Sequence, residues 1–180
     1  MRVLIAEQDH ATYARLLREA APELEVLTSG DSAELASQAP RCEVWLGQPD
    51  LLASLLRQGH KPEWVQSTWA GITPLLAEGL PRDYRLTRAV GIFGQVMAEY
   101  MLTYMLGHER EVLSRLVSQV ERRWDDRPGR SLEGRKVLIV GTGDIGQRVA
   151  EFLVPFGVTV YGVASSAREQ APFVEVAGLA

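Results

Sequence analysis

Residues 141–146 carry the motif with the clearest chemistry in this sequence, because they spell G-T-G-D-I-G directly after the apolar run 136–140. In a G-x-G-x-x-G loop the first glycine permits a tight turn, the second lets the backbone approach a diphosphate, and the third permits close packing of a helix on a strand. The N–H groups at the start of that helix then bind phosphate oxygens. The pattern predicts a dinucleotide-binding loop with contacts from Gly141, Gly143, Asp144, Ile145 and Gly146.

The surroundings of this loop favour the same interpretation. Apolar residues follow at helical spacing from Ile145 to Leu153, Pro155 and Gly157 end the helix, and residues 158–163 form the next apolar strand. The alternative is a glycine-rich turn in an unrelated α/β unit, which the strand–loop–helix–strand order makes the weaker interpretation.

The end of that next strand bears on the choice between NAD and NADP. In NAD sites a carboxylate about 20 residues beyond the loop accepts hydrogen bonds from the ribose 2′-hydroxyl. Here residues 164–168 spell A-S-S-A-R and hold no carboxylate. Two hydroxyls and a guanidinium suit a 2′-phosphate, which an aspartate would repel. We therefore expect Ser165, Ser166 and Arg168 to bind NADP; NAD, or a merely polar loop, is the alternative.

Composition excludes several classes of function. The 180 residues are 46% hydrophobic and 23% charged, which is ordinary for a soluble globular protein. The net charge of −4, with dispersed basic residues, argues against a nucleic-acid partner, and no apolar run approaches the roughly 20 residues of a membrane span. The single cysteine, Cys42, cannot form an internal disulfide. We expect a cytoplasmic protein without a metal site.

The first half of the chain alternates short apolar runs with amphipathic segments. Strands are predicted at residues 3–6, 24–27, 43–46, 64–67 and 84–90, with helices after the first three of them. Asp9 and Asp31 are the expected N-caps of the first two helices. Near-continuously apolar strands in this order are typical of an α/β fold with a parallel sheet covered by helices on both faces. We assign residues 1–93 to this first domain.

A long helix is predicted over residues 95–123, and its first half is apolar nearly all round. Such a helix must be buried on more than one side, by its own sheet and by a second subunit. Its Met97, Met101 and Met105 stripe is better explained by core or dimer packing than by a soft-metal site. Residues 127–130 resemble a linker, and residues 94–180 form the second domain, a crossover helix followed by an incomplete dinucleotide-binding domain.

Three stretches carry a resemblance to a known family: residues 64–72 (W-V-Q-S-T-W-A-G-I), 94–100 (G-Q-V-M-A-E-Y) and 134–146. The chain resembles the D-isomer-specific 2-hydroxyacid dehydrogenases, most closely their glyoxylate/hydroxypyruvate reductase-like branch. This resemblance implies a flavodoxin-like parallel-sheet substrate domain followed by the first part of a Rossmann dinucleotide-binding domain. It also implies an oxidoreductase that reduces a small 2-keto acid to the 2-hydroxy acid with NAD(P)H.

The resemblance places the loop that holds the substrate carboxylate at Trp69, Ala70 and Gly71. Small residues before a helix starting at Ile72 would leave backbone N–H groups free for an anion. Trp69 departs from the family, where a small residue is usual, and Trp45 falls where related reductases place an aromatic side chain that lines the cleft. Core packing is the alternative for both tryptophans. Gly94 and Gln95 are expected near the cofactor or the substrate, and Trp124 in packing.

The resemblance also implies a catalytic histidine, glutamate and arginine from later in the family's cofactor domain, and we find no matching positions in this chain. His10, His60 and His108 accompany no motif that would orient them, so we expect them on the surface and the chain alone to be inactive. An incomplete sheet leaves an apolar edge, which favours a homodimer through residues 94–124, a partly disordered tail from about Arg168, or a second chain in the gap.

Two other functions remain open from the sequence. The chain can instead be a non-catalytic nucleotide-binding or interaction module. It can also be a methyltransferase-type α/β protein, although such proteins normally hold the ribose with an acidic residue where this chain has Ala164.

Overall fold

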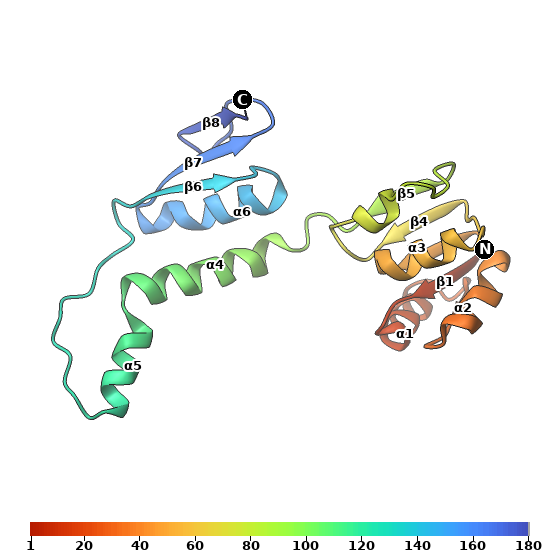
Figure 1. Cartoon of the computed structure of the whole chain (residues 1–180), viewed down its shortest axis with the longest axis horizontal. Coiled ribbons are helices and arrows are strands. Elements are labelled where there is room, and N and C mark those ends of the chain that lie inside the picture. The colour runs from red at the N-terminus through yellow and green to blue at the C-terminus, as the bar shows by residue number, and fades with distance from the viewer. Residues whose placement is uncertain (180) are drawn as a thin grey trace. The chain divides into compact units, whose positions relative to one another are not determined.

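The computed structural model describes residues 1–179, and the chain divides into two compact units, Met1–Val90 (unit 1) and Gly91–Ala180 (unit 2). The sequence places the boundary slightly later, after residue 93. Both units are of the α/β class, with parallel strands and helices packed on them (Figure 1). Within residues 1–179, no helix has the length and apolar character that crossing a membrane requires.

The sheet of unit 1 has the strand order β2-β1-β3-β4-β5, and all its neighbouring strands are parallel. This is the order of flavodoxin-like folds, as predicted. Parallel pairing brings the carboxyl ends of all the strands to one edge of the sheet, where ligands bind in such folds. The strands are β1 (Arg2–Ala6), β2 (Glu25–Thr28), β3 (Val44–Gly47), β4 (Trp64–Ser67) and β5 (Arg85–Arg88).

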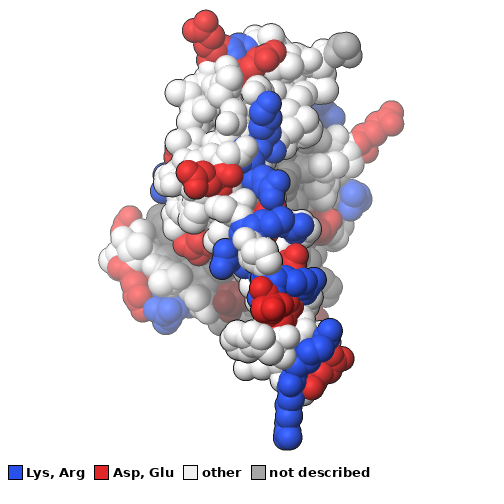
Figure 2. Space-filling view, turned by 90° about the vertical axis from the view of Figure 1, so that its left-hand side faces the viewer, with Lys and Arg blue, Asp and Glu red and all other residues white. Residues whose placement is uncertain are grey.

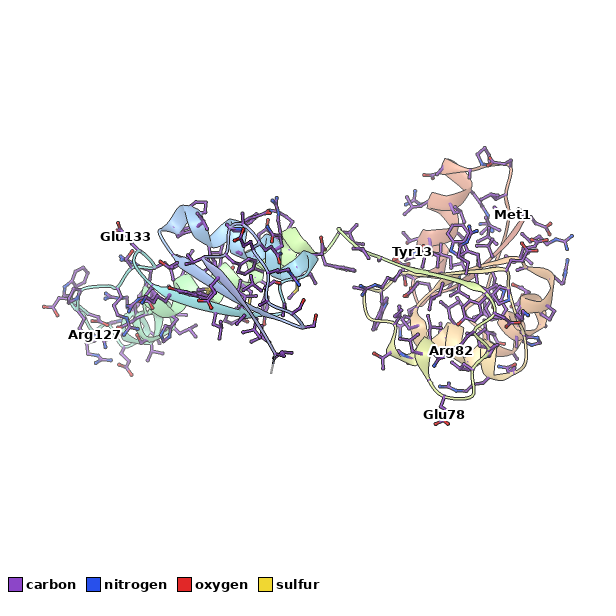
Figure 3. The ribbon with its side chains drawn as sticks, turned by 90° about the horizontal axis from the view of Figure 1, so that it is seen from above. Met1, Tyr13, Glu78, Arg82, Arg127 and Glu133 are labelled. Carbon is purple, nitrogen blue, oxygen red and sulfur yellow. The ribbon has the colours of Figure 1, made fainter. Side chains whose placement is uncertain are left out.

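Helices cover both faces of this sheet because alternate residues of a strand point to opposite sides. Leu4 and Ala6 pack in the larger core cluster with residues of α2 and α3, whereas Ile5 packs with α1. Side chains fill the space on either side of the sheet (Figure 3). The helices are α1 (His10–Ala20), α2 (Ser32–Gln38) and α3 (Pro49–Arg57), with short 3₁₀ segments η1 (Ala39–Arg41) and η2 (Thr73–Leu76).

The two predicted N-caps differ. The Asp31 carboxylate accepts hydrogen bonds from the N–H groups of Ala33 at 2.8 Å and Glu34 at 2.9 Å, so it caps α2. Asp9 also precedes a helix, but its side chain makes no capping hydrogen bond to α1. Only the Asp31 prediction is therefore confirmed.

Unit 2 has a three-stranded parallel sheet in the order β6-β7-β8. Helix α6 packs on this sheet, and α4 packs on α6 (Figure 1). Ala98 of α4 and Ala150 of α6 are completely buried, since small side chains let the two helices approach closely. The elements are α4 (Gly94–Glu109), α5 (Val112–Val120), β6 (Lys136–Val140), α6 (Asp144–Leu153), η3 (Val154–Phe156), β7 (Thr159–Ala164) and β8 (Glu175–Gly178).

The predicted long helix is broken, so that expectation is wrong. Glu111 adopts a left-handed conformation with φ 53° between α4 and α5. The Arg115 guanidinium supports the break, because its Nε donates to the carbonyl of Arg110 at 3.2 Å and its Nη1 to that of Asp125 at 3.1 Å. Apolar periodicity alone gives no sign of this local turn.

The expected burial of α4 on several sides is also not seen within the chain. Helix α4 packs on α6 along one side only, while Val96, Tyr100 and Tyr104 are 56%, 57% and 61% exposed. The two tyrosine rings lie against each other with centroids 4.7 Å apart. Met97 and Met101 are 39% and 40% exposed, whereas Met105 packs against the core of unit 2, so only one methionine of the stripe has the predicted core role.

The C-terminal segment is ordered, which corrects the expectation of a partly disordered tail. Strand β8 pairs in parallel with β7, and Phe173 and Val176 are buried in the core of unit 2. At the opposite edge of the sheet from β8 lies strand β6, whose Leu138 and Val140 side chains are 62% and 77% exposed. The predicted uncovered apolar edge is therefore present.

Candidate functional site

The phosphate loop lies between β6 and α6, as the motif requires. Gly141 has φ +96°, a conformation that favours glycine, and its N–H donates to the carbonyl of Val163 at 2.8 Å. A Cβ atom on Gly146 would lie 2.0 Å from the carbonyl oxygen of Gly141. Both glycines are thus needed for the close path of the loop against its own helix.

Gly143 has a different role in the geometry. It precedes α6 with an extended backbone, and a Cβ atom built on it meets nothing within 4 Å. The backbone at this position is therefore open to a ligand, although nothing in the protein crowds it. A cradle of this kind fits a diphosphate lying on the first turn of a ten-residue helix.

The two side chains between these glycines point away from the cradle. The Asp144 carboxylate accepts a hydrogen bond from the N–H of Gly91 at 3.2 Å, and an acidic group in the first helical turn also stabilises the helix. Ile145 packs against the core of unit 2. These residues are therefore expected to offer backbone rather than side-chain contacts to a nucleotide.

Arg168 lies directly beside the phosphate loop. Its Nη2 donates to Thr142 Oγ1 at 2.5 Å, and its Nε donates to Gln170 Oε1 at 2.7 Å. Gln170 in turn donates to the carbonyl of Thr142 at 2.8 Å. Ser165 and Ser166 follow β7 and are exposed. The segment after β7 is thus fixed to the loop through one arginine and one glutamine.

Thr142 and Gln170 were not singled out from the sequence. Thr142 is only 3% exposed, and it is one of the variable positions of the glycine motif. Gln170 lies in a segment without periodicity, so no sequence pattern identifies it. Arg148 of α6 was missed as well: its side chain packs against Gly94, where a Cβ atom would lie 2.9 Å from it, and it donates to Gln95 Oε1 at 3.4 Å.

The predicted substrate loop follows β4 in unit 1. The Ser67 hydroxyl accepts from the N–H of Trp69 at 3.1 Å and donates to its carbonyl at 3.0 Å. Just before the loop, Thr68 Oγ1 donates at 2.6 Å to the buried carboxylate of Glu7, at the end of β1. The hydroxyl groups of Ser67 and Thr68 therefore fix the start of the loop to the sheet.

The exposed side of this loop carries the groups that a ligand can reach. Trp69 is 50% exposed, and the N–H groups of Ala70 and Gly71 have no protein acceptor among residues 1–179. The helix expected from Ile72 is only the short 3₁₀ segment η2. Free N–H groups are thus present, but without the full helix that the sequence suggests.

Trp45 requires a correction. Its side chain is completely buried in the core of unit 1, and its indole N–H donates to the carbonyl of Ala39 at 3.3 Å. A side chain without exposed surface cannot line a cleft, so core packing is the role that the structure supports. Cys42 is buried in the same core, and this burial raises the pKa of its thiol to about 11.

The histidines do not gather at either loop. His108 is exposed, whereas His10 is partly buried and its Nδ1 has no hydrogen-bond partner, which the sequence did not predict. In the part of the chain that the structure covers, no group of three or more His, Cys, Asp or Glu side chains is placed to hold a metal ion.

Charged residues fasten the segment 121–135 to the helices before it. The carboxylate of Glu109 pairs with Arg130 at 3.3 Å and Arg135 at 2.8 Å, and that of Glu111 with Arg127 at 3.3 Å; within the segment, Arg127 also pairs with Asp125 at 2.7 Å. Basic and acidic side chains accordingly stand next to one another on this face (Figure 2). The pKa of the Asp125 carboxyl lies well below its usual range because of the hydrogen bond from Arg127. These ion pairs hold the segment 121–135 in place, and we assign them no role in ligand binding.

Comparison with known proteins agrees with this geometry. Residues 102–179 match the family described as "D-isomer specific 2-hydroxyacid dehydrogenase, NAD binding domain". A crystal structure of a D-isomer specific 2-hydroxyacid dehydrogenase family protein from Aeromonas salmonicida is 37% identical with a TM-score of 0.90, over 99% of this chain and 58% of that one. The fold of both units is therefore shared with a dehydrogenase of this family.

Two further relatives extend the comparison. An uncharacterized protein from Streptomyces coelicolor is 32% identical over 120 residues, covering 67% of this chain and 42% of the relative. An NADPH-dependent glyoxylate/hydroxypyruvate reductase from Sinorhizobium meliloti, solved with NADP and sulfate, is 22% identical with a TM-score of 0.78. The match covers 99% of this chain and 56% of the reductase, and at this identity it supports the fold alone. The chain spans about half the length of these relatives.

Proposed function

Because this chain belongs to the D-isomer specific 2-hydroxyacid dehydrogenase family, we propose that it carries the nucleotide loop and the substrate loop of an enzyme that reduces a small 2-keto acid of the glyoxylate or hydroxypyruvate type with NADPH. The nucleotide loop is residues 141–146, with Ser165, Ser166 and Arg168 beside it. The substrate loop is Trp69, Ala70 and Gly71.

The observation that carries the cofactor assignment is the place of the Arg168 guanidinium. It lies 2.5 Å from Thr142 Oγ1 of the phosphate loop, at the end of β7 where the adenosine ribose lies in this class of fold. Residues 164–168 supply no carboxylate that would repel a 2′-phosphate. A guanidinium already held by Thr142 and Gln170 loses little entropy when it binds an anion.

The residues of this chain would divide the binding work between them. The cradle around Gly143 binds the diphosphate with backbone N–H groups, and Arg168 with the two serines binds the 2′-phosphate. The N–H groups of Ala70 and Gly71 bind the carboxylate of the keto acid. When bound, the nicotinamide cofactor supplies the hydride. We assign no proton donor among residues 1–179, so the chain by itself binds its ligands without turnover.

Calorimetric titration of the 180-residue chain with NADPH and with NADH tests the cofactor assignment. We expect saturable binding that favours NADPH, and Arg168→Ala should weaken NADPH binding about tenfold or more, since charge-assisted hydrogen bonds contribute about 1.5–3 kcal/mol. NADH binding should change little. Lys136→Ala removes a cation from the opposite end of β6 and serves as the control.

Equal loss of NADPH and NADH affinity in Arg168→Ala would contradict the 2′-phosphate role and leave the arginine a structural one. Tighter binding of NADH than of NADPH by the unaltered chain would overturn the cofactor preference while leaving the family in place.

The partner proposed for unit 2 is a second copy of the chain, docked on α4 and α5. Both helices expose large apolar side chains, among them Val96, Tyr100, Leu116 and Val120. Where the helices meet, a hollow of about 630 Å³ has a mixed lining of apolar, polar and charged residues: Thr103, Tyr104, Gly107, His108, Glu111, Val112, Leu113, Ser114 and Arg130. Apolar surface of this extent favours association, and helices from two copies can cover each other's faces.

A further inference from the structure

Arg88, the last residue of β5, lies beside the proposed substrate loop. Its Nη1 donates to the carbonyl of Ala70 at 2.6 Å, and its side chain is exposed. Both residues belong to unit 1 and stand at the carboxyl edge of its parallel sheet, where this class of fold binds ligands. The guanidinium is thus held in place at the ligand edge by one hydrogen bond.

The rest of the Arg88 guanidinium has no partner. Across residues 1–179 no carboxylate lies within ion-pair distance of it, and its Nε and Nη2 have no acceptor. The buried carboxylate of Glu7, which follows β1, is bonded to Thr68 and to the N–H of Gln8. By contrast, Arg130 and Arg135 of unit 2 are both paired with Glu109. Arg88 is therefore a positioned cation whose Nε and Nη2 groups are available to bind a ligand.

The loop geometry separates this cation from the proposed carboxylate site. In a trans peptide the C=O and the following N–H point in opposite directions, so the guanidinium on the Ala70 carbonyl lies on the other side of that peptide from the Gly71 N–H. One carboxylate bound at the Gly71 N–H does not also occupy Arg88. The guanidinium is left for a second group of the same ligand.

From this arrangement we infer that Arg88 is a specificity-determining residue that selects 2-keto acids with a second anionic group, a carboxylate or a phosphate, at the end away from the keto acid. This inference rests on the proposed substrate loop, but it replaces the glyoxylate or hydroxypyruvate type, whose members carry one anionic group, with a dianionic 2-keto acid as the preferred substrate. A planar guanidinium with free Nε and Nη2 groups matches the two oxygens of such an anion. Trp69 is half exposed on the same loop.

The test compares two ligands that differ only in the second charge. We would titrate the ¹⁵N-labelled 180-residue chain with 2-oxoglutarate and with its 5-methyl ester at constant ionic strength, and follow the amide shifts of Ala70 and Gly71. The unaltered chain should bind the dianion about tenfold more tightly than the monoester, the factor given by about 1.4 kcal/mol from one charge-assisted contact.

Two variants separate charge from loop positioning. Arg88→Gln keeps a donor for the Ala70 carbonyl but removes the charge, and it should abolish the preference while the monoester binds as before. Arg85→Gln changes the same residue type at the other end of β5 and should keep the preference. Equal affinities for both ligands, or a preference that survives in Arg88→Gln, would overturn the inference and leave the loop assignment intact. Absence of shifts at Ala70 and Gly71 with either ligand would refute the substrate-loop proposal and this inference together.

Discussion

Gly143 and Gly146 show that two glycines of one motif can be required for unrelated reasons. At Gly146 a side chain has no room, since its Cβ atom would lie 2.0 Å from the Gly141 carbonyl oxygen. At Gly143 a side chain has room in the protein, but it would occupy the space in which we place the diphosphate. Folding therefore depends on Gly146 and nucleotide binding on Gly143.

This difference predicts opposite behaviour of two alanine variants. Gly146→Ala should destabilise unit 2 by about 2 kcal/mol or more, as overpacking against rigid backbone does. Gly143→Ala should leave the free energy of unfolding within about 0.5 kcal/mol, because its φ of −74° suits alanine, yet weaken NADPH binding. Urea unfolding and calorimetry on both variants check this. Unchanged stability in Gly146→Ala would show that the loop has another path.

Single residues also show where sequence reasoning stops. Periodicity cannot tell Trp45, buried in the core, from a tryptophan that lines a cleft, because both follow the same apolar strand pattern. Trp69 is correctly placed at an exposed loop because the small residues after it indicate a turn. The partners of Arg168 depend on Gln170, which comes close only through tertiary folding.

At the scale of elements, the strands that were predicted best are apolar runs bounded by polar or turn residues. Strands β4 (Trp64–Ser67) and β6 (Lys136–Val140) have the predicted bounds. Strand β8 was missed because Glu175–Gly178 is short and contains alanine and glycine, which favour strands weakly; pairing with β7 stabilises it instead. The break between α4 and α5 was missed because Glu111 is not a residue that normally indicates a left-handed turn.

The support that Arg115 gives to this break leads to a prediction for the element. Arg115→Ala removes donors from the carbonyls of Arg110, Asp125 and Arg127, and it should cost about 1–3 kcal/mol, the range for hydrogen bonds to charged groups and unmade partners. Hydrogen exchange should rise in residues 112–127 but not in β6. Gln119→Ala, on the exposed side of α5, is the control. A gain in helical circular dichroism would instead show that the two helices fuse.

At the scale of the molecule, exposed apolar surface is the dominant feature of unit 2. It occurs on α4 and α5 and, separately, at Leu138 and Val140 of β6. Large apolar side chains exposed together on neighbouring helices favour a binding partner. The proposed dimer covers the helices and leaves the strand edge unaffected, so the two surfaces can be tested apart.

Sedimentation equilibrium of interface variants tests the dimer. Tyr104→Glu places a charge in the proposed helix interface and should weaken self-association at least about tenfold, since burying an unpaired charge costs several kcal/mol. Leu16→Glu, on the exposed side of α1 in unit 1, should have no effect. If Leu138→Glu weakens association and Tyr104→Glu does not, the strand edge rather than the helices joins the copies.

The four tryptophans of the chain lie in four different surroundings. Trp45 is enclosed in apolar side chains, the indole N–H of Trp64 donates to Thr87 at 2.6 Å, Trp69 is half exposed, and Trp124 is 89% exposed. Their fluorescence should therefore differ in wavelength and in access to a quencher. A set of single-tryptophan chains would thus give separate optical reporters of the core of unit 1, its sheet, the substrate loop and the end of α5.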